Sequence, residues 1–183
     1  MMQIMVFFAI VVLSAFSVFS QSSVANYSGT WTLDLANSKL DERSRIESMK
    51  MTVSQTDKEI TVATETKRPA PPANAPQGRP GGGMGRGGFG GGDGKFTYSL
   101  DGKETSDVQV TGMGSTPVKL KAQSEGGKLK LSTTRTINSQ MGEVTLTTKE
   151  EWGLSADGKT LTVNREMETP RGTNSVTLVF TKN

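Results

Sequence analysis

The fold is decided by residues 143–168, "EVTLTTKEEWGLSADGKTLTVNREME", where two alternating segments flank an Asp-Gly dipeptide. Successive side chains of a β-strand point to opposite faces of the sheet, so every second residue shares a face. One face of the first segment holds Val144, Leu146, Thr148, Glu150, Trp152 and Leu154. One face of the second segment holds Leu161, Val163, Arg165 and Met167. The stretch predicts a β-hairpin whose apolar face is interrupted by Glu150 and Arg165.

The Asp-Gly dipeptide at 157–158 sets the pairing of this hairpin, because tight hairpin turns need residues that adopt positive φ. A turn centred on it places Glu150 opposite Arg165. Trp152 then lies opposite Val163. A slip of two residues would keep the faces and change the partners. The sequence therefore predicts a charged pair on the apolar face.

Similar alternating segments recur along the chain, separated by turn residues such as Asp101-Gly102 and Gly126-Gly127. About ten strands are predicted, at 27–35, 46–55, 59–67, 95–100, 104–111, 117–123, 128–138, 143–154, 159–168 and 175–182. Only 37–48, "NSKLDERSRIES", is open to a short helix, as a lid or connector. The predicted class is all-β and mostly antiparallel.

Up-and-down strands in this number favour a closed barrel, because closure removes exposed sheet edges. We therefore predict an antiparallel up-and-down β-barrel of about 8–10 strands, with a β-sandwich as the rival architecture. Such a barrel is either packed shut or encloses one small ligand. The choice between those two interiors is the functional question.

The first 20 residues are typical of a signal peptide, with an apolar run at 4–19 followed by small and polar residues. The run is shorter than the roughly 18–20 residues that span a membrane, although an uncleaved anchor stays open because no Lys or Arg precedes it. We expect a secreted or periplasmic protein, with no stable membrane insertion after cleavage. Residues 21–183 are expected to form a single domain.

The chain has no His and no Cys. Their absence excludes Ser–His and Cys–His nucleophilic catalysis and the ordinary zinc sites, and we expect no metal and no cofactor. An enzyme of carboxylate chemistry would depend on Glu150, Glu151 and Asp107, which show no facing pair at a known separation. We therefore expect a protein that is not an enzyme.

The segment 68–94, "RPAPPANAPQGRPGGGMGRGGFGGGDG", is rich in proline and glycine, and we expect a disordered loop inserted between two strands. From residue 67 to 95 there are five basic residues and one acidic residue, a net charge of +4, whereas the whole chain carries +3. The rest of the chain therefore has no basic bias. One Arg-Gly-Gly at 86–88 is far short of the repeats that bind RNA, so no nucleic-acid partner is expected.

The best candidates for function are charged residues on apolar faces. Arg165 and Glu150 fall among apolar neighbours, and so does Arg135 in the alternation that starts at Leu129. Two arginines and one glutamate leave excess positive charge near an interior, which an anionic ligand such as a carboxylate would compensate. Alternatively, Arg165 lies over an aromatic ring, and for Arg135 we expect a head group in water at the barrel mouth.

The motif "SGTW" at Ser28–Trp31 resembles the glycine-x-tryptophan signature of the lipocalin and fatty-acid-binding (calycin) superfamily. The fuller pattern of "GTWTLDLANSKL", "DGKE", "EEWGLSADGKTLTVNRE" and "LVF" resembles small exported bacterial proteins described as lipocalin-like. The resemblance implies a barrel with an apolar-ligand cavity. It also implies that Trp31 closes one barrel end beneath a late-strand arginine, which Arg165 matches.

The leading hypothesis is an exported binding protein that holds a small hydrophobic or amphipathic ligand in the barrel. Its ligand-binding residues would be Trp31, Arg165, Glu150, Trp152, Arg135, Tyr98 and Phe96. The alternative is a packed barrel that serves as an envelope or surface interaction protein, with loop 68–94 as its contact. No protein partner is identified.

Overall fold

The computed structural model describes residues 25–41, 44–69, 93–111, 114–139 and 142–183. These residues form ten β-strands and no helix, so this part of the chain has no helix that could cross a membrane. The strands are β1 (Gly29–Leu33), β2 (Ser48–Gln55), β3 (Glu59–Lys67), β4 (Gly94–Ser99), β5 (Thr105–Thr111), β6 (Gly114–Glu125), β7 (Lys128–Ser139), β8 (Gly142–Leu154), β9 (Thr160–Thr169) and β10 (Gly172–Lys182).

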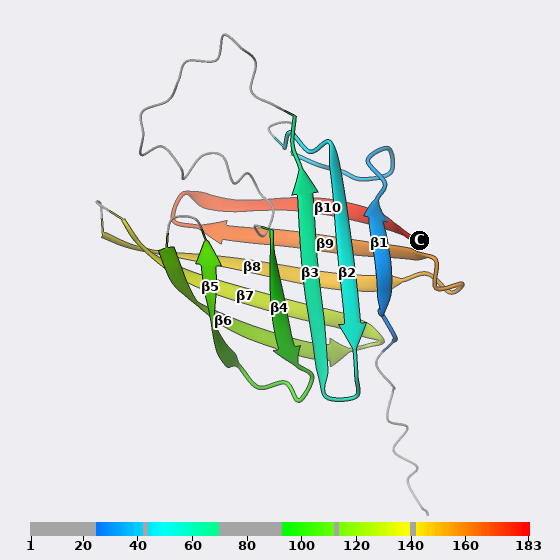
Figure 1. Ribbon diagram of the computed structural model, residues 1–183, viewed down its shortest axis with the longest axis horizontal. Coiled ribbons are helices and arrows are strands. Elements are labelled where there is room, and N and C mark those ends of the chain that lie inside the picture. The colour runs from blue at the N-terminus through cyan, green and yellow to red at the C-terminus, as the bar shows by residue number, and fades with distance from the viewer. Residues whose placement is uncertain (1–24, 42–43, 70–92, 112–113, 140–141) are drawn as a thin grey trace, which may run out of the picture.

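The strands form one antiparallel sheet in the order β4-β3-β2-β1-β10-β9-β8-β7-β6-β5. Neighbours in the sheet are neighbours in the chain, with the exception of β1 and β10, which pair although they are the first and the last strands. In Figure 1, β1 to β4 run steeply in front of β6 to β10, which lie behind them. The strands β4 and β5 are the two edges of the sheet and meet at a seam without a shared ladder. The predicted up-and-down barrel is therefore confirmed as a nearly closed barrel.

The predicted register of the β8–β9 hairpin is confirmed. Glu150 lies opposite Arg165, and Trp152 lies opposite Val163. The turn between them includes Gly158 at φ 69°, the left-handed region that glycine adopts without a Cβ clash. Since this turn fixes the pairing, both charged side chains share the inner face of the barrel.

Several observed strand ends differ from the predicted ones, most of all the starts of β6 and β10. β1 begins at Gly29 rather than residue 27, while β6 and β10 begin at Gly114 and Gly172, three residues before the predicted starts. The added residues of β6 and β10 are mostly polar, so they extend the hairpin ladders without the apolar alternation that marks a strand in the sequence.

The connector at 37–48 contains no helix among its described residues. Lys39 instead forms an isolated antiparallel bridge with Thr177 of β10. The Asn174 side-chain amide donates to Asp41 Oδ2 at 2.9 Å. The segment is therefore a connector held along β10.

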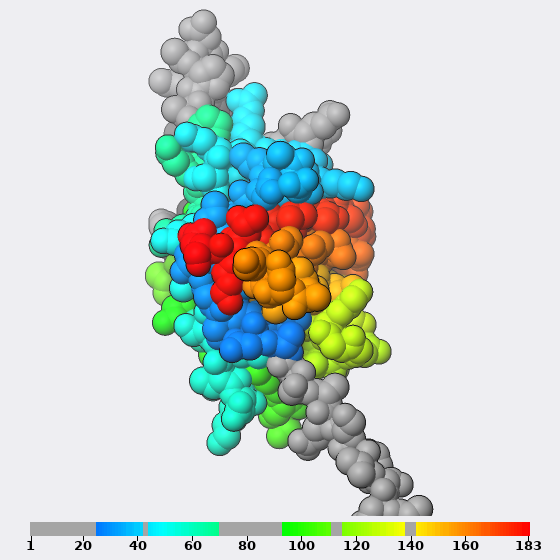
Figure 2. Space-filling view, turned by 90° about the vertical axis from the view of Figure 1, so that its right-hand side faces the viewer, coloured from blue at the N-terminus to red at the C-terminus, as the bar shows by residue number. Residues whose placement is uncertain are grey.

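One end of the barrel interior, which we call the closed end, is packed without solvent access. Its members are fully or almost fully buried: Tyr27, Trp31, Leu129, Trp152, Leu161 and Phe180. The Trp31 indole Nε1 donates to the Tyr27 carbonyl at 3.0 Å, and the Tyr27 hydroxyl donates to the Trp152 carbonyl at 3.2 Å. Figure 2 views the molecule from this side, where β1, β10 and the β8–β9 turn form a continuous surface.

The opposite end of the interior, which we call the open end, is only half-buried. It comprises inner-face residues of β7, β8 and β9, namely Ile137, Val144, Leu146 and Met167. These side chains continue the same alternation as the closed end but retain solvent access. The interior therefore changes from fully buried residues at the closed end to half-buried apolar residues at the open end.

Two sequence predictions lie outside the described residues. The predicted signal peptide at 1–20 is one, and most of the predicted disordered loop at 68–94 is the other.

Candidate ligand-binding site

The inner-face charges begin with a hydrogen-bonded ion pair between β8 and β9. Arg165 Nε donates to Glu150 Oε1 at 2.7 Å, and the two side chains are only 7% and 15% exposed. The Trp152 indole Nε1 donates to the other oxygen, Glu150 Oε2, also at 2.7 Å. Both carboxylate oxygens thus accept a hydrogen bond, and Glu150 neutralises Arg165.

Arg135 lies on the same inner face of β7, between Val118 of β6 and Leu146 of β8. Its guanidinium carbon is 5.4 Å from the centroid of the Phe96 ring on β4. Its Nε is buried and has no hydrogen-bond partner. Burial lowers the pKa of the Arg135 guanidinium, and the like charge of Arg165 lowers it as well. Arg135 is therefore a partly desolvated cation that the protein satisfies incompletely.

A buried hydroxyl pair adjoins these charges. The Tyr98 hydroxyl of β4 and Thr133 Oγ1 of β7 are 2.8 Å apart, and either can donate. Thr133 lies opposite Thr148 of β8, which is also buried. Burial raises the pKa of the Tyr98 phenol, and the negative charge of Glu150 raises it further. Tyr98 is therefore neutral at physiological pH and acts as a hydrogen-bonding group.

The two arginines and Glu150 leave an excess of one positive charge on this part of the inner face. Asp107 of β5 lies on the same row as Val118 and Arg135, but its side chain is exposed and accepts the Val108 backbone N–H at 2.7 Å. An anion bound at Arg135 would supply both the negative charge that balances this excess and an acceptor for the Arg135 Nε–H.

The seven residues predicted to bind a ligand all lie on the inner face, in two groups. Trp31 belongs to the closed end, while Glu150 links Trp152 to Arg165. Phe96, Tyr98 and Arg135 lie farther toward the open end. The water-exposed head expected for Arg135 is corrected in part, because its Nε is buried. The predicted pair of Arg165 with Glu150 is confirmed.

The sequence interpretation missed Tyr27, Thr133, Thr148 and Lys182. Thr133 and Thr148 stand in apolar alternations, which is the signal that points to them. Lys182 lies opposite Trp31, and its Nζ is 5.2 Å from the Trp31 ring centroid. The cation above Trp31 is thus a lysine of the last strand, where the family resemblance implied Arg165. Gly29 leaves room for it, since an added Cβ there would lie 2.6 Å from Lys182 Cε.

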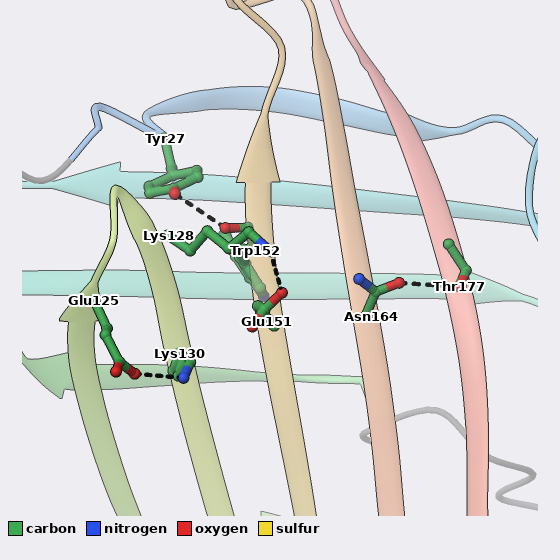
Figure 3. A network of polar contacts seen from close by, with 8 residues as sticks. All are labelled: Tyr27, Glu125, Lys128, Lys130, Glu151, Trp152, Asn164 and Thr177. Atoms are coloured by element: carbon green, nitrogen blue, oxygen red, sulfur yellow. Dashed lines mark hydrogen bonds and ion pairs between the residues drawn. The ribbon is translucent and has the colours of Figure 1, made fainter.

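A groove of about 700 Å³ lies on the outer face of β6 to β10 rather than inside the barrel. Two of the four lysines that line it are paired, in the Lys130–Glu125 and Lys149–Glu168 ion pairs. Figure 3 shows part of this polar surface, with Lys128 bonded to Glu151 and Asn164 to Thr177. Among the residues that line the groove, no buried side-chain nitrogen or oxygen lacks a hydrogen-bond partner.

The carboxylates considered for an enzyme are dispersed. Glu150 points inward, the neighbouring Glu151 accepts Lys128 on the outer surface, and Asp107 is exposed on β5. In the described part of the chain, no three His, Cys, Asp or Glu side chains form a group that could hold a metal ion.

The chain matches no protein-family model, and no curated protein matches it. The nearly closed antiparallel barrel is compatible with a lipocalin-like fold.

Proposed function

We propose that this protein is an exported, non-catalytic, lipocalin-like binding protein for a small amphipathic molecule with an anionic head, such as a carboxylate. The observation that carries the proposal is the buried Nε of Arg135, which has no partner although the neighbouring Arg165 is paired with Glu150. A half-buried cation with a buried, unpartnered donor costs free energy unless an anion accompanies it.

The neighbours of Arg135 suit the rest of such a ligand. Leu146 lies directly opposite Arg135, and Ile137 and Val144 pair one step farther along β7 and β8. These half-buried apolar side chains favour a hydrocarbon segment, while Tyr98 and Thr133 offer hydroxyl groups near the head. Ligand sites of this type combine an apolar lining with a few placed polar groups.

Titration with dodecanoate tests the proposal, with dodecanol as a neutral probe of the same chain length. We expect the purified protein to bind dodecanoate more tightly than dodecanol. Arg135→Gln should weaken dodecanoate binding by about tenfold or more, because a charge-assisted bond is lost. Its effect on dodecanol should be small.

Arg171→Gln is the matched control, since Arg171 is an exposed arginine in the turn after β9. It should leave both affinities unchanged. Equal loss in the two variants would indicate a general charge effect, and absence of dodecanoate binding in the wild type would refute the proposal. Unfolding in urea should show that Arg135→Gln keeps its fold, within about 1 kcal/mol of wild type.

Export is part of the proposal and depends on the first 20 residues of the sequence. The intact mass of the protein recovered from the culture medium or the periplasm tests it. A mass that lacks the N-terminal segment supports export with cleavage, whereas recovery of the chain in the cytoplasm at full mass would contradict it.

A further inference from the structure

Strand β5 differs from the other strands because it has polar side chains on its inner side and valines on its outer side. Asp107 lies opposite Val118, whose side chain is 1% exposed and points inward, so Asp107 and Gln109 share the inner side. Val108 and Val110 therefore point outward and are 56% and 77% exposed. Large aliphatic side chains on an outer strand face indicate a surface that another chain covers.

β5 is also an edge strand. Within the described residues it pairs with β6 alone, and no ladder joins it to β4 (Figure 1). The Val108 N–H donates to the Asp107 carboxylate, so it is directed away from β6. Because backbone groups alternate along a strand, the N–H groups of Ser106 and Val110 face the same free edge. The edge thus offers backbone groups that pair with no other strand, beside exposed valines.

We propose that β5 pairs antiparallel with β5 of a second copy of this chain, with the two-fold axis at Val108. This register places Val108 opposite Val108 of the other copy and uses all seven residues of β5. Such an isologous contact requires a self-complementary strand, and β5 meets that requirement.

The side chains of β5 support this register. Val108 and Val110 of the two copies form one apolar cluster on the outer face, beside the exposed Pro117. On the other face, Asp107 of one copy lies opposite Gln109 of the other, so a carboxylate meets an amide donor. A register centred on Asp107 would instead place two carboxylates opposite each other, which is destabilising.

Asp107 moderates the association. In the single chain its carboxylate occupies the Val108 N–H, which pairing must release to the second copy. The Asp107 carboxylate therefore competes with pairing between the two copies and weakens it. The dimer then forms in a concentration-dependent equilibrium.

Cysteine crosslinking tests the register directly, because the chain has no natural cysteine. In a hydrogen-bonded antiparallel pair the two Cα atoms are about 5.5 Å apart, within the range of a disulfide. Under mild oxidation Val108→Cys should form a covalent dimer at least about tenfold faster than Leu35→Cys, which carries its cysteine at an exposed site outside the strands. Equal rates would refute the contact, and fastest crosslinking by Val110→Cys would refute the register.

Analytical ultracentrifugation of the purified protein tests the surface without crosslinking. We expect a wild-type dimer whose dissociation constant rises about tenfold or more in the double variant V108K/V110K, because lysines at an edge oppose pairing. Leu35→Lys, which adds one lysine at an exposed site outside the strands, should leave the dimer unchanged. A monomer up to about 1 mM, or a dimer that V108K/V110K does not weaken, would overturn the proposal.

Discussion

The two ends of the barrel interior are built from the same alternating strands and differ in how completely they are packed. At the closed end Trp31 and Trp152 are inaccessible to solvent, and both indole Nε1 groups donate hydrogen bonds. At the open end Leu146 and Met167 are half-buried, and Arg135 Nε has no partner. Packing therefore stabilises the closed end most, and the proposed ligand site lies at the end where packing is incomplete.

Truncating a side chain at each end gives the largest contrast. Trp31→Ala removes a fully buried ring and its hydrogen bond to Tyr27, so we expect a loss of about 3–5 kcal/mol in the free energy of unfolding. Leu146→Ala, at a half-buried site, should cost about 1 kcal/mol. Urea unfolding of both variants measures the difference. Similar losses would show that the two ends are equally packed.

Removing one partner of the Glu150–Arg165 ion pair tests whether the pair belongs to the packed part of the interior. Glu150→Ala leaves Arg165 buried without its counter-charge, and we expect a loss of about 3 kcal/mol in the free energy of unfolding. The double variant E150L/R165L should regain most of that loss, because no unpaired charge remains.

The exposed pair of Lys67 and Glu47 is the control for this experiment. Glu47→Ala should cost less than about 1 kcal/mol, since solvent screens the pair. If Glu150→Ala cost no more than Glu47→Ala, the inner pair would be solvated and the open end would extend past it.

Alkaline titration probes the smallest expected effect, at Tyr98. The folded-state pKa of its phenol is raised above that of the unfolded chain, which is about 10. Its contribution to stability is therefore complete below about pH 10 and is lost as the pH rises above that value, because the unfolded chain releases the proton more readily. Tyr98→Phe should unfold with a weaker dependence on pH above about 10. An unchanged dependence would show that Tyr98 is solvated.

Much of the fold could be predicted because the period-two alternation and the glycine turns are local signals. The Asp157-Gly158 turn sets the β8–β9 register, so the pairing of Glu150 with Arg165 followed from the sequence. The starts of β6 and β10 could not be predicted in this way, since their polar residues pair through backbone groups that carry no sequence pattern.

The candidate site could be predicted only in part. The alternation placed Arg135 and Arg165 on the inner face, and the turn paired Glu150 with Arg165, but neither signal showed how the protein surrounds Arg135. Its surroundings depend on Phe96 of β4, which approaches Arg135 from a strand far along the chain and leaves its Nε buried without a partner. The inward charges are thus a property of the sequence, and the unsatisfied one is a property of the packing.

By itself, the sequence determined that this chain forms antiparallel strands with charged residues on their apolar faces, because side-chain direction follows from local backbone geometry. Only the tertiary structure decided that the sheet curls into a nearly closed barrel with one packed end, that Lys182 covers Trp31, and that β5 turns its valines outward. These features depend on which strands meet in space, and a period of two is the same whichever face becomes the inside.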